Sequence, residues 1–185
     1  FDITRGVLQG ESLSPFLFNL FINDMKKHLV DSGVRGVNID GINELVNILY
    51  ADDLVLLSDS PLNAKKALAA LEKYCQENEL EPNINKTKMM IFRKGGRIKN
   101  NLEFRIKNVP LEIVSEYCYL GVIFSSSRKF VRASNFAINK VISAISKCKE
   151  TMARARLQSW EGRERIFKAT VEATLLYGSE TWSPW

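Results

Sequence analysis

The sequence predicts an α+β fold, with helices and antiparallel strands over residues 1–124 and only helices over residues 125–185. Hydrophobic residues make up 45% and charged residues 25% of the 185 positions, which is ordinary for a globular chain. Apolar runs of strand length alternate with runs of helical period as far as about residue 124. From about Phe130 the period is helical throughout. This change of element type predicts a domain boundary between residues 124 and 125.

Two Ser-Pro pairs predict the starts of helices. In "SPFLFNLFINDMKKHL", Ser14 is the expected N-cap and Pro15 the first helical residue, where its missing N–H costs nothing. One apolar stripe follows, made of Phe18, Phe21, Ile22, Met25 and Leu29. "SPLNAKKALAALEKYCQEN" starts in the same way at Ser60 and Pro61. Its apolar stripe consists of Ala64, Ala67, Leu68, Leu71 and Cys75.

Strand-like runs follow each predicted helix. Residues 45–50 and 54–58 are rich in Leu, Val and Ile and flank Ala51–Asp52–Asp53, which predicts a hairpin. Further strands are expected at 87–93, 102–107, 110–114 and 117–124, with turns at Gly95–Gly96 and Asn100–Asn101.

The tail after Phe130 predicts two helices or more. The first has an apolar stripe made of Ile138, Val141, Ile142, Ile145 and Met152. Apolar residues of the next are Ile166, Val171, Leu175 and Leu176. Gly178 is the expected stop, because glycine favours the left-handed conformation that ends helices.

Charge is distributed unevenly along the chain. Residues 1–60 hold 4 basic and 9 acidic side chains, residues 86–107 hold 8 and 1, and residues 125–185 hold 11 and 5. This pattern fits a protein that holds cations at one place and a polyanion beside it, although solvated helix faces give a similar pattern. No apolar run approaches the roughly 20 residues that span a bilayer. The three cysteines and the single His28 suit neither a zinc site nor a disulfide framework, which favours a reducing compartment.

Asp52 and Asp53 interrupt an apolar run, although burying an unpaired charge is costly. A tight turn would lift both carboxylates to the tip of the hairpin. Two carboxylates that close repel one another unless a divalent cation neutralises them. Mg²⁺ commonly takes one or two carboxylates plus substrate phosphates, so the pair is a candidate metal site. An ordinary Asp-rich turn is the alternative.

Four segments, taken in order, resemble the motifs of reverse transcriptases. "RGVLQGESLSPFLFNLFINDM" resembles the Gly-Gln-Gly segment with its Ser-Pro helix, and "YADD" the metal-binding motif. "LEPNINKTKMMIF" resembles the Asn-x-x-Lys-Thr segment, with Pro82 where an apolar residue is usual, and "YLGVIF" the primer-grip turn. The terminal "LLYGSETW" is similar to the end of the polymerase region in non-LTR (LINE-like) retrotransposons. The resemblance implies the second half of a polymerase palm, an antiparallel sheet with packed helices, followed by a thumb-like helical segment.

The same resemblance implies an RNA-directed DNA polymerase that transfers a nucleotide from a dNTP to a primer 3′-OH with two Mg²⁺ or Mn²⁺ ions. The implied catalytic residues are Asp52, Asp53 and Lys86, with Asp52 as the bridging metal ligand and Asp53 as the weaker or outer one. Nucleotide and template contacts fall on Gln9, Gly10, Tyr50, Ala51 and Asn83. The primer grip falls on Tyr119, Leu120 and Gly121, and contacts to the nucleic-acid backbone on Arg128, Lys129, Arg132 and Lys140.

Several of these residues also have simpler explanations. Gln9 could cap a loop, Lys86 could be a solvated lysine at a strand edge, and Tyr119 could belong to the core.

Further arginines of the tail could track phosphates without reading sequence. They are Arg154, Arg156, Arg163 and Arg165.

The family's site needs a further carboxylate from a strand upstream of "RGVLQG". Asp2 is rejected for this role because it lies only eight residues before Gly10, on the strand that leads into the same loop. We therefore expect a piece of a longer polymerase that cannot polymerise alone. Its partners would be an RNA template, a DNA primer, dNTP, and the fingers and upstream palm, with no membrane. The alternatives are a non-catalytic nucleic-acid-binding remnant of a decayed mobile element and a group II intron maturase-type polymerase.

Overall fold

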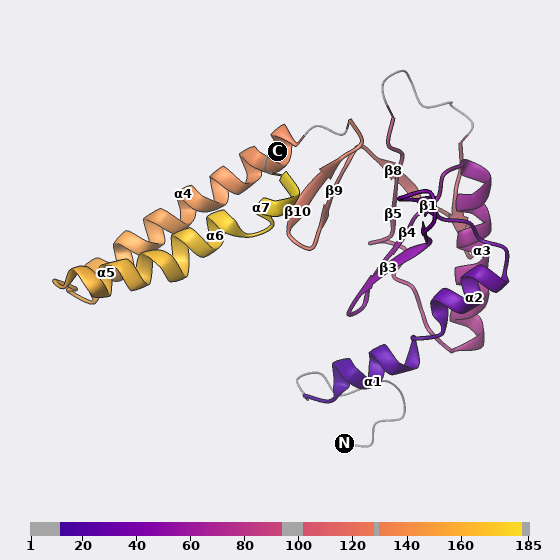
Figure 1. The fold of residues 1–185 in the computed structure, drawn as a ribbon, viewed down its shortest axis with the longest axis horizontal. Helices are drawn as coiled ribbons and strands as arrows, with labels where there is room; N and C mark the ends of the chain where they lie inside the picture. The colour runs from indigo at the N-terminus through magenta and orange to yellow at the C-terminus, as the bar shows by residue number, and fades with distance from the viewer. Residues whose placement is uncertain (1–11, 94–101, 128–129, 183–185) are drawn as a thin grey trace. The chain divides into compact units, whose positions relative to one another are not determined.

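The computed structural model describes residues 12–93, 102–127 and 130–182, and it combines helices with small two-stranded sheets (Figure 1). This combination agrees with the predicted α+β class. The chain divides into two compact units. The first unit contains residues 1–87 and 98–112, and the second contains residues 88–97 and 113–185. The boundary at residues 124/125 stays a prediction, since these units group the chain by its packing.

The first unit begins with two short helices where one was predicted. Helix α1 spans Ser14–Phe21 and helix α2 spans Met25–Asp31. The helix breaks because Asn23 and Met25 bond to the carbonyls three residues before them, at 3.4 and 3.1 Å, which is the tighter 3₁₀ spacing. The predicted N-cap at Ser14 is also wrong. Ser14 is the first residue of the helix, and Leu13 occupies the cap without a side-chain hydrogen bond.

Helix α3 (Pro61–Glu77) forms as the sequence predicts. The Ser60 side chain accepts a hydrogen bond from the Asn63 N–H at 3.3 Å, and a proline opens the first turn. The predicted apolar stripe is buried, apart from Ala64, which is half-buried. Burial raises the pKa of the Cys75 thiol within this stripe. Helix α3 packs against α2 and strand β6. The largest fully buried side chains of the described chain lie in this unit: Leu29, Tyr74, Phe104 and Ile106.

The strands of the first unit are short and form antiparallel pairs. They are β1 (Val37–Asn38) with β2 (Glu44–Leu45), β3 (Asn47–Tyr50) with β4 (Asp53–Leu56), and β6 (Arg105–Ile106) with β7 (Val109–Pro110). The β3–β4 pair confirms the hairpin predicted around residues 51–53. Strand β1 was not predicted, and the strand predicted over 45–50 is divided between the end of β2 and β3. The turns expected at Gly95–Gly96 and Asn100–Asn101 lie outside the described residues.

The second unit joins short strands to a helical tail. Its strands are β5 (Lys88–Met90), β8 (Glu112–Val114), β9 (Glu116–Tyr119) and β10 (Val122–Ser125). Strands β9 and β10 form an antiparallel hairpin where the sequence predicted one strand over 117–124, because Leu120 and Gly121 make a tight turn. The helices are α4 (Val131–Arg154), α5 (Trp160–Phe167), a π-helical turn (Lys168–Glu172), α6 (Ala173–Leu176) and α7 (Ser179–Trp182).

Helix α4 lies alongside the continuous α5–α6 run (Figure 1). Its predicted apolar stripe is partly wrong, because Ile138 and Ile142 are 52% and 56% exposed. The face that packs instead runs through Val141, Ile145, Cys148 and Met152, a spacing of four, three and four residues. The apolar arc of α4 is thus wider than the surface that the described helices cover. None of the described helices has both the length and the apolar character that crossing a membrane requires.

Candidate active site

The β3–β4 hairpin places the two candidate metal ligands at its tip. Tyr50 pairs with Asp53 across the strands, so Ala51 and Asp52 alone form the turn. Both carboxylates are exposed, which removes the cost of burial that the sequence seemed to imply. Asp52 lies in the turn and Asp53 is the first residue of β4, so the strict alternation of strand side chains does not separate them.

The turn holds Ala51 in an uncommon backbone conformation. Its φ is +52°, in the left-handed region that costs a residue with a Cβ about 1–2 kcal/mol. Such outliers cluster where the surrounding structure imposes them, often at functional sites. Sequence reasoning placed Ala51 beside the nucleotide but gave no sign of this strain, since alanine carries no turn signal.

The donor set of the hairpin fits a hard divalent cation. Carboxylate oxygens are the ligands that Mg²⁺ and Mn²⁺ favour, and Asp52 and Asp53 offer four of them at one exposed point. Over the part of the chain that the structure describes, no group of three or more His, Cys, Asp or Glu side chains could hold a metal. Among the described residues, Asp52 and Asp53 are therefore a pair of carboxylates with no third His, Cys, Asp or Glu side chain grouped with them.

A depression of about 600 Å³ lies beside the hairpin. Strand β3 lines it with Asn47, Leu49 and Tyr50, together with Ala51 of the turn. The Asn47 Oδ1 atom is buried and has no hydrogen-bond partner among the described residues. The helical side contributes Asn19, Ile22, Asn23 and Lys26.

Sequence reasoning missed these polar lining residues. Asn19, Asn23 and Lys26 recur at intervals of four and three residues, a helical spacing that would have placed them on one face. Tyr50, a candidate nucleotide contact, is 63% exposed at the end of the depression.

Asn83 and Lys86 lie on a short turn after helix α3. The Asn83 side chain accepts a hydrogen bond from the Lys86 N–H at 3.2 Å, and the Asn83 carbonyl accepts bonds from the N–H and hydroxyl of Thr87 at 3.0 and 2.9 Å. Asn83 therefore fixes the local fold of the "NINKTK" segment, in addition to any contact with substrate. Lys86 is exposed.

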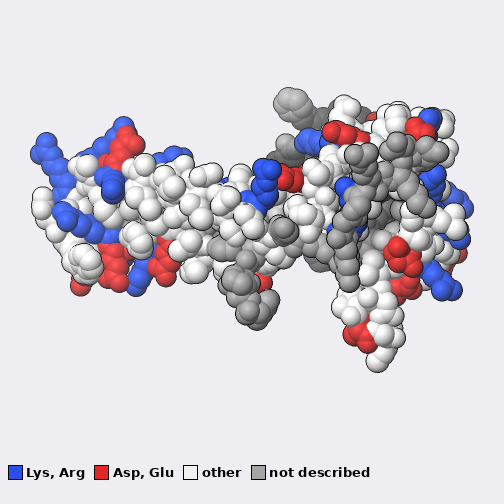
Figure 2. All heavy atoms as spheres, turned by 90° about the horizontal axis from the view of Figure 1, so that it is seen from above, with Lys and Arg blue, Asp and Glu red and all other residues white. Residues whose placement is uncertain are grey.

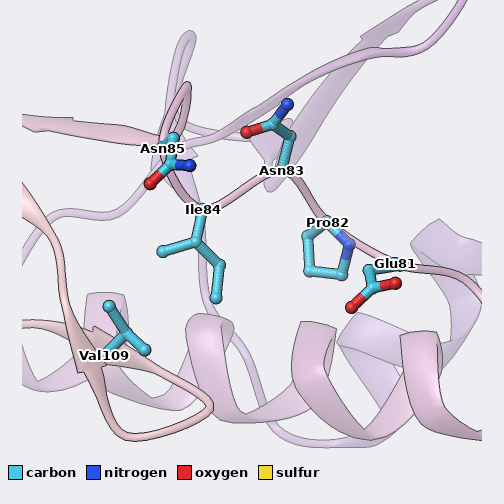
Figure 3. Close-up of a pocket in the computed structure, with 6 residues that line it drawn as sticks. All are labelled: Glu81, Pro82, Asn83, Ile84, Asn85 and Val109. Carbon is cyan, nitrogen blue, oxygen red and sulfur yellow. The ribbon is translucent and has the colours of Figure 1, made fainter.

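An open pocket borders this segment (Figure 3). Its lining includes Glu81, Asn83, Asn85 and, from β7, Val109. The side chain of Ile84 extends toward Val109, while the amide of Asn83 points away from both (Figure 3). The pocket is therefore apolar on the side of the hairpin β6–β7, and Asn83 does not direct its amide there.

The remaining described candidates belong to the second unit. Tyr119 ends β9, and Leu120 and Gly121 form the turn to β10 with φ values of +47° and +78°. Two successive positive φ values define a type I′ turn, the usual turn of a two-residue hairpin. The predicted primer-grip residues thus do form one turn. Tyr119 is half-buried and its ring lies 6.4 Å from that of Phe124, between centroids.

The basic candidates are only partly described. Gln9, Gly10, Arg128 and Lys129 lie outside the described residues. The Arg132 Nε atom pairs with Glu116 at 3.1 Å, so this side chain holds the start of α4 to β9. Figure 2 shows Lys and Arg of the helical tail gathered toward its outer end and interspersed with Asp and Glu. Arg154, the last residue of α4, pairs with Glu150 at 2.6 Å.

Comparison with known proteins bears on this site. Residues 1–124 match the sequence family described as reverse transcriptase (RNA-dependent DNA polymerase). The chain is 29% identical over 147 residues to a putative uncharacterized transposon-derived protein of Caenorhabditis elegans. The match covers 80% of the chain and 52% of that protein. No solved structure matches the chain.

Two further relatives are named as polymerases of mobile elements. One is a retrovirus-related Pol polyprotein from the type-1 retrotransposable element R2 of Nasonia vitripennis, 28% identical over 159 residues, with 80% of the chain and 15% of that protein covered. The other is the RNA-directed DNA polymerase from mobile element jockey of Drosophila funebris, which is 28% identical over 185 residues. This match covers 97% of the chain and 19% of that protein. The chain thus spans between 15% and 52% of the length of these relatives. With the YADD turn inside the matched region, the chain belongs to the reverse transcriptase family, and its recognition as a LINE-like member is confirmed.

Proposed function

We propose that this chain supplies part of the active site of an RNA-directed DNA polymerase. The reaction is transfer of a nucleotide from a dNTP to the 3′-OH of a primer paired with RNA. The observation that carries the proposal is the exposure of Asp52 and Asp53 together at the tip of a two-residue hairpin turn within the family match. Residues 1–124 would form part of a palm and residues 125–185 a thumb-like segment.

Asp52 and Asp53 would hold Mg²⁺ or Mn²⁺, with Asp52 as the bridging ligand. The bound ions would neutralise charge on the attacking and leaving oxygens. Tyr50, Ala51 and Asn83, with Gln9 and Gly10, would orient the nucleotide and its template base. Lys86, exposed next to the Asn83 turn, would offer its ammonium group to the leaving phosphates, as a proton donor or a fixed charge.

Two carboxylates alone cannot complete a two-metal site. We place the missing ligand in the remainder of the polymerase, since Asp2 lies only eight residues before Gly10. The isolated 185-residue chain would then be unable to extend a primer. Incorporation of nucleotide into a primed RNA template by this chain alone, lost on Asp52→Asn, would overturn that part of the proposal.

The catalytic proposal is tested in a longer polymerase that includes these residues and the upstream palm. Asp52→Asn should lower primer extension at least about a hundredfold, because removing a direct metal ligand costs no less than removing its outer support, and Asp53→Asn, at the weaker or outer ligand, should lower it about ten- to a hundredfold. The matched control is Asp31→Asn, which neutralises an exposed aspartate at the end of α2. Retention of full activity in both site variants would contradict the proposal.

Binding of nucleic acid is a separate expectation, tested on the chain itself. If Arg128, Lys129, Arg132 and the rest of the tail neutralise three or four phosphates, the logarithm of affinity for primer–template should fall with the logarithm of salt with a slope of about −3 to −4. A flat response would remove the phosphate-tracking role. Salt-dependent binding without activity in the longer protein would instead favour the non-catalytic remnant.

A further inference from the structure

The turn between β9 and β10 is held from outside by the helical tail. In a two-residue hairpin turn, the carbonyls of the two turn residues do not take part in the strand ladder, so they need other partners. Here the Tyr177 hydroxyl donates to the Leu120 carbonyl at 2.7 Å. The Lys140 ammonium donates to the next carbonyl, that of Gly121, at 3.3 Å. Both carbonyls of the turn are therefore satisfied by residues of the tail.

Tyr177 also packs over the turn. A Cβ built on Gly121 would lie 3.0 Å from Cε1 of the Tyr177 ring, so any other residue would force the ring to shift by a few tenths of an ångström. Gly121 is therefore constrained twice, by its φ of +78° and by the ring. The primer-grip sequence "YLG" and the terminal "LLYG" are thus complementary parts of one contact.

The backbone explains how Tyr177 reaches the turn. Helix α6 ends at Leu176, and Tyr177 takes an extended conformation with φ −60° and ψ +116°. Gly178 follows with a φ of +66°, which turns the chain into α7. The tyrosine therefore leaves the helix at the point where its ring meets the hairpin. Lys140 is oriented by the Phe136 ring, whose centroid lies 4.4 Å from the ammonium nitrogen.

We propose that Tyr177 and Lys140 are positioning residues for the primer grip, so that the helical tail fixes where the primer end is held. That the turn grips the primer rests on the proposed function. The contacts of Tyr177 and Lys140 with the turn are independent of it. A two-stranded hairpin is marginally stable by itself, so anchoring its turn limits how far the tip can move. Lys140 acts here through the turn carbonyl, which gives it a task besides the phosphate contact proposed above.

The first experiment measures the anchor on the 185-residue chain, without nucleic acid. Amide hydrogen exchange of Tyr119 and Val122, which pair across the turn, should become about three- to tenfold faster in Tyr177→Phe, which loses only the hydroxyl. Lys140→Met should act in the same direction, while Lys140→Arg, which keeps a cationic donor, should restore slow exchange. The controls are Tyr117→Phe on β9 and Lys147→Met, an exposed lysine further along α4. Unchanged exchange in Tyr177→Phe and Lys140→Met would overturn the anchor.

The second experiment measures whether the anchored turn positions the primer. The affinity of the chain for a primer–template with a recessed 3′ end is compared with its affinity for a blunt duplex of equal length. Tyr177→Phe should lose the preference for the recessed end about three- to tenfold and keep its affinity for the blunt duplex. Equal loss on both duplexes, or no loss despite faster exchange, would overturn the positioning role. A wild-type chain that shows no preference would instead contradict the proposed function, and the exchange data would still decide whether the anchor exists.

Discussion

The turn at Asp52 and Asp53 removes the desolvation cost of placing two charges in an apolar run. Six of the eight residues in "NILY" and "LVLL" on either side of the "ADD" segment are apolar, so a continuous strand would have carried two charges through a hydrophobic layer. The turn at residues 51–52 places both carboxylates in water instead. Their mutual repulsion then depends on solvent and on any bound cation, not on a low-dielectric interior. A cation that binds at this tip, as proposed, would therefore come and go without destabilising the core.

Ala51 should be a residue at which glycine stabilises the protein. Its φ of +52° strains a side chain with a Cβ, so Ala51→Gly should raise the free energy of unfolding by about 0.5–1 kcal/mol, even though glycine adds entropy to the unfolded chain. The measurement is urea unfolding followed by circular dichroism. Ala69→Gly is the matched control, because Ala69 is exposed within α3 and should lose about 1 kcal/mol. Equal losses in both variants would show that residue 51 is not strained.

For single residues, the sequence suggested candidates from their residue types, but it did not predict their backbone conformation. The aspartates, Asn83 and the "YLG" turn could be picked out because their residue types fit a chemical task at a recognisable spacing. The strained backbone of Ala51 could not be predicted in this way. Neither could the contact of Tyr177, whose hydroxyl bonds to a carbonyl 57 residues away in the sequence. Contacts at such separations depend on how the elements pack, which no local pattern encodes.

Among the elements, α3 and the α1–α2 segment show which helix signals are reliable. Ser60 and Pro61 capped a helix as predicted because its apolar stripe has partners in α2 and β6. The same Ser-Pro signal at Ser14 started a helix one residue early, and the helix broke at residues 22–24. The apolar period continues across this break, so periodicity alone predicted one helix. A stripe indicates that a face will be buried, but it does not identify the partner or the bend.

Tyr74 connects α3 to the α1–α2 corner and should make this contact sensitive to alkaline pH. It is 1% exposed, and its hydroxyl donates to Asp24 Oδ1 at 2.6 Å. Burial, and then the hydrogen bond and the charge of Asp24, raise the pKa of the phenol above its usual value near 10. The folded state therefore keeps a proton that the unfolded state releases above pH 10. The stabilisation is complete below pH 10 and is lost as the pH rises further.

Tyr74→Phe tests this contact. Near pH 8 the variant should lose about 1 kcal/mol of unfolding free energy, because Asp24 loses its donor. Above pH 10 the advantage of the wild type should shrink by up to about 1.4 kcal/mol per pH unit. The measurement is the urea midpoint of both proteins between pH 8 and pH 11. Tyr117→Phe should keep the wild-type pH dependence, and the idea fails if Tyr74→Phe keeps it too.

For the whole molecule, the described strands and helices leave much apolar surface without a partner. Each described sheet has two strands, so every one of these strands has an open edge. Helix α1 exposes a row of large apolar side chains, among them Leu13, Phe16 and Leu20, at 63–66%. Contiguous patches of this kind mark surfaces that other protein covers. The matched region makes up 52% and 15% of two of the relatives, so the segments that lie outside it in a longer polymerase are the natural candidates.

Without those segments the purified chain should associate with itself through α1. Burying a Leu or Phe side chain contributes about 1.5–3 kcal/mol, so Phe16→Glu combined with Leu20→Glu should weaken self-association by a factor of about ten or more. Sedimentation velocity over a range of concentrations measures this. The matched control, Ile39→Glu with Ile42→Glu, adds the same charge at two exposed isoleucines between β1 and β2, at 66% and 89%. If that control disperses the chain equally well, charge and not the α1 surface controls association. A wild-type chain that sediments as a monomer and melts cooperatively would mean that this apolar surface is tolerated in water.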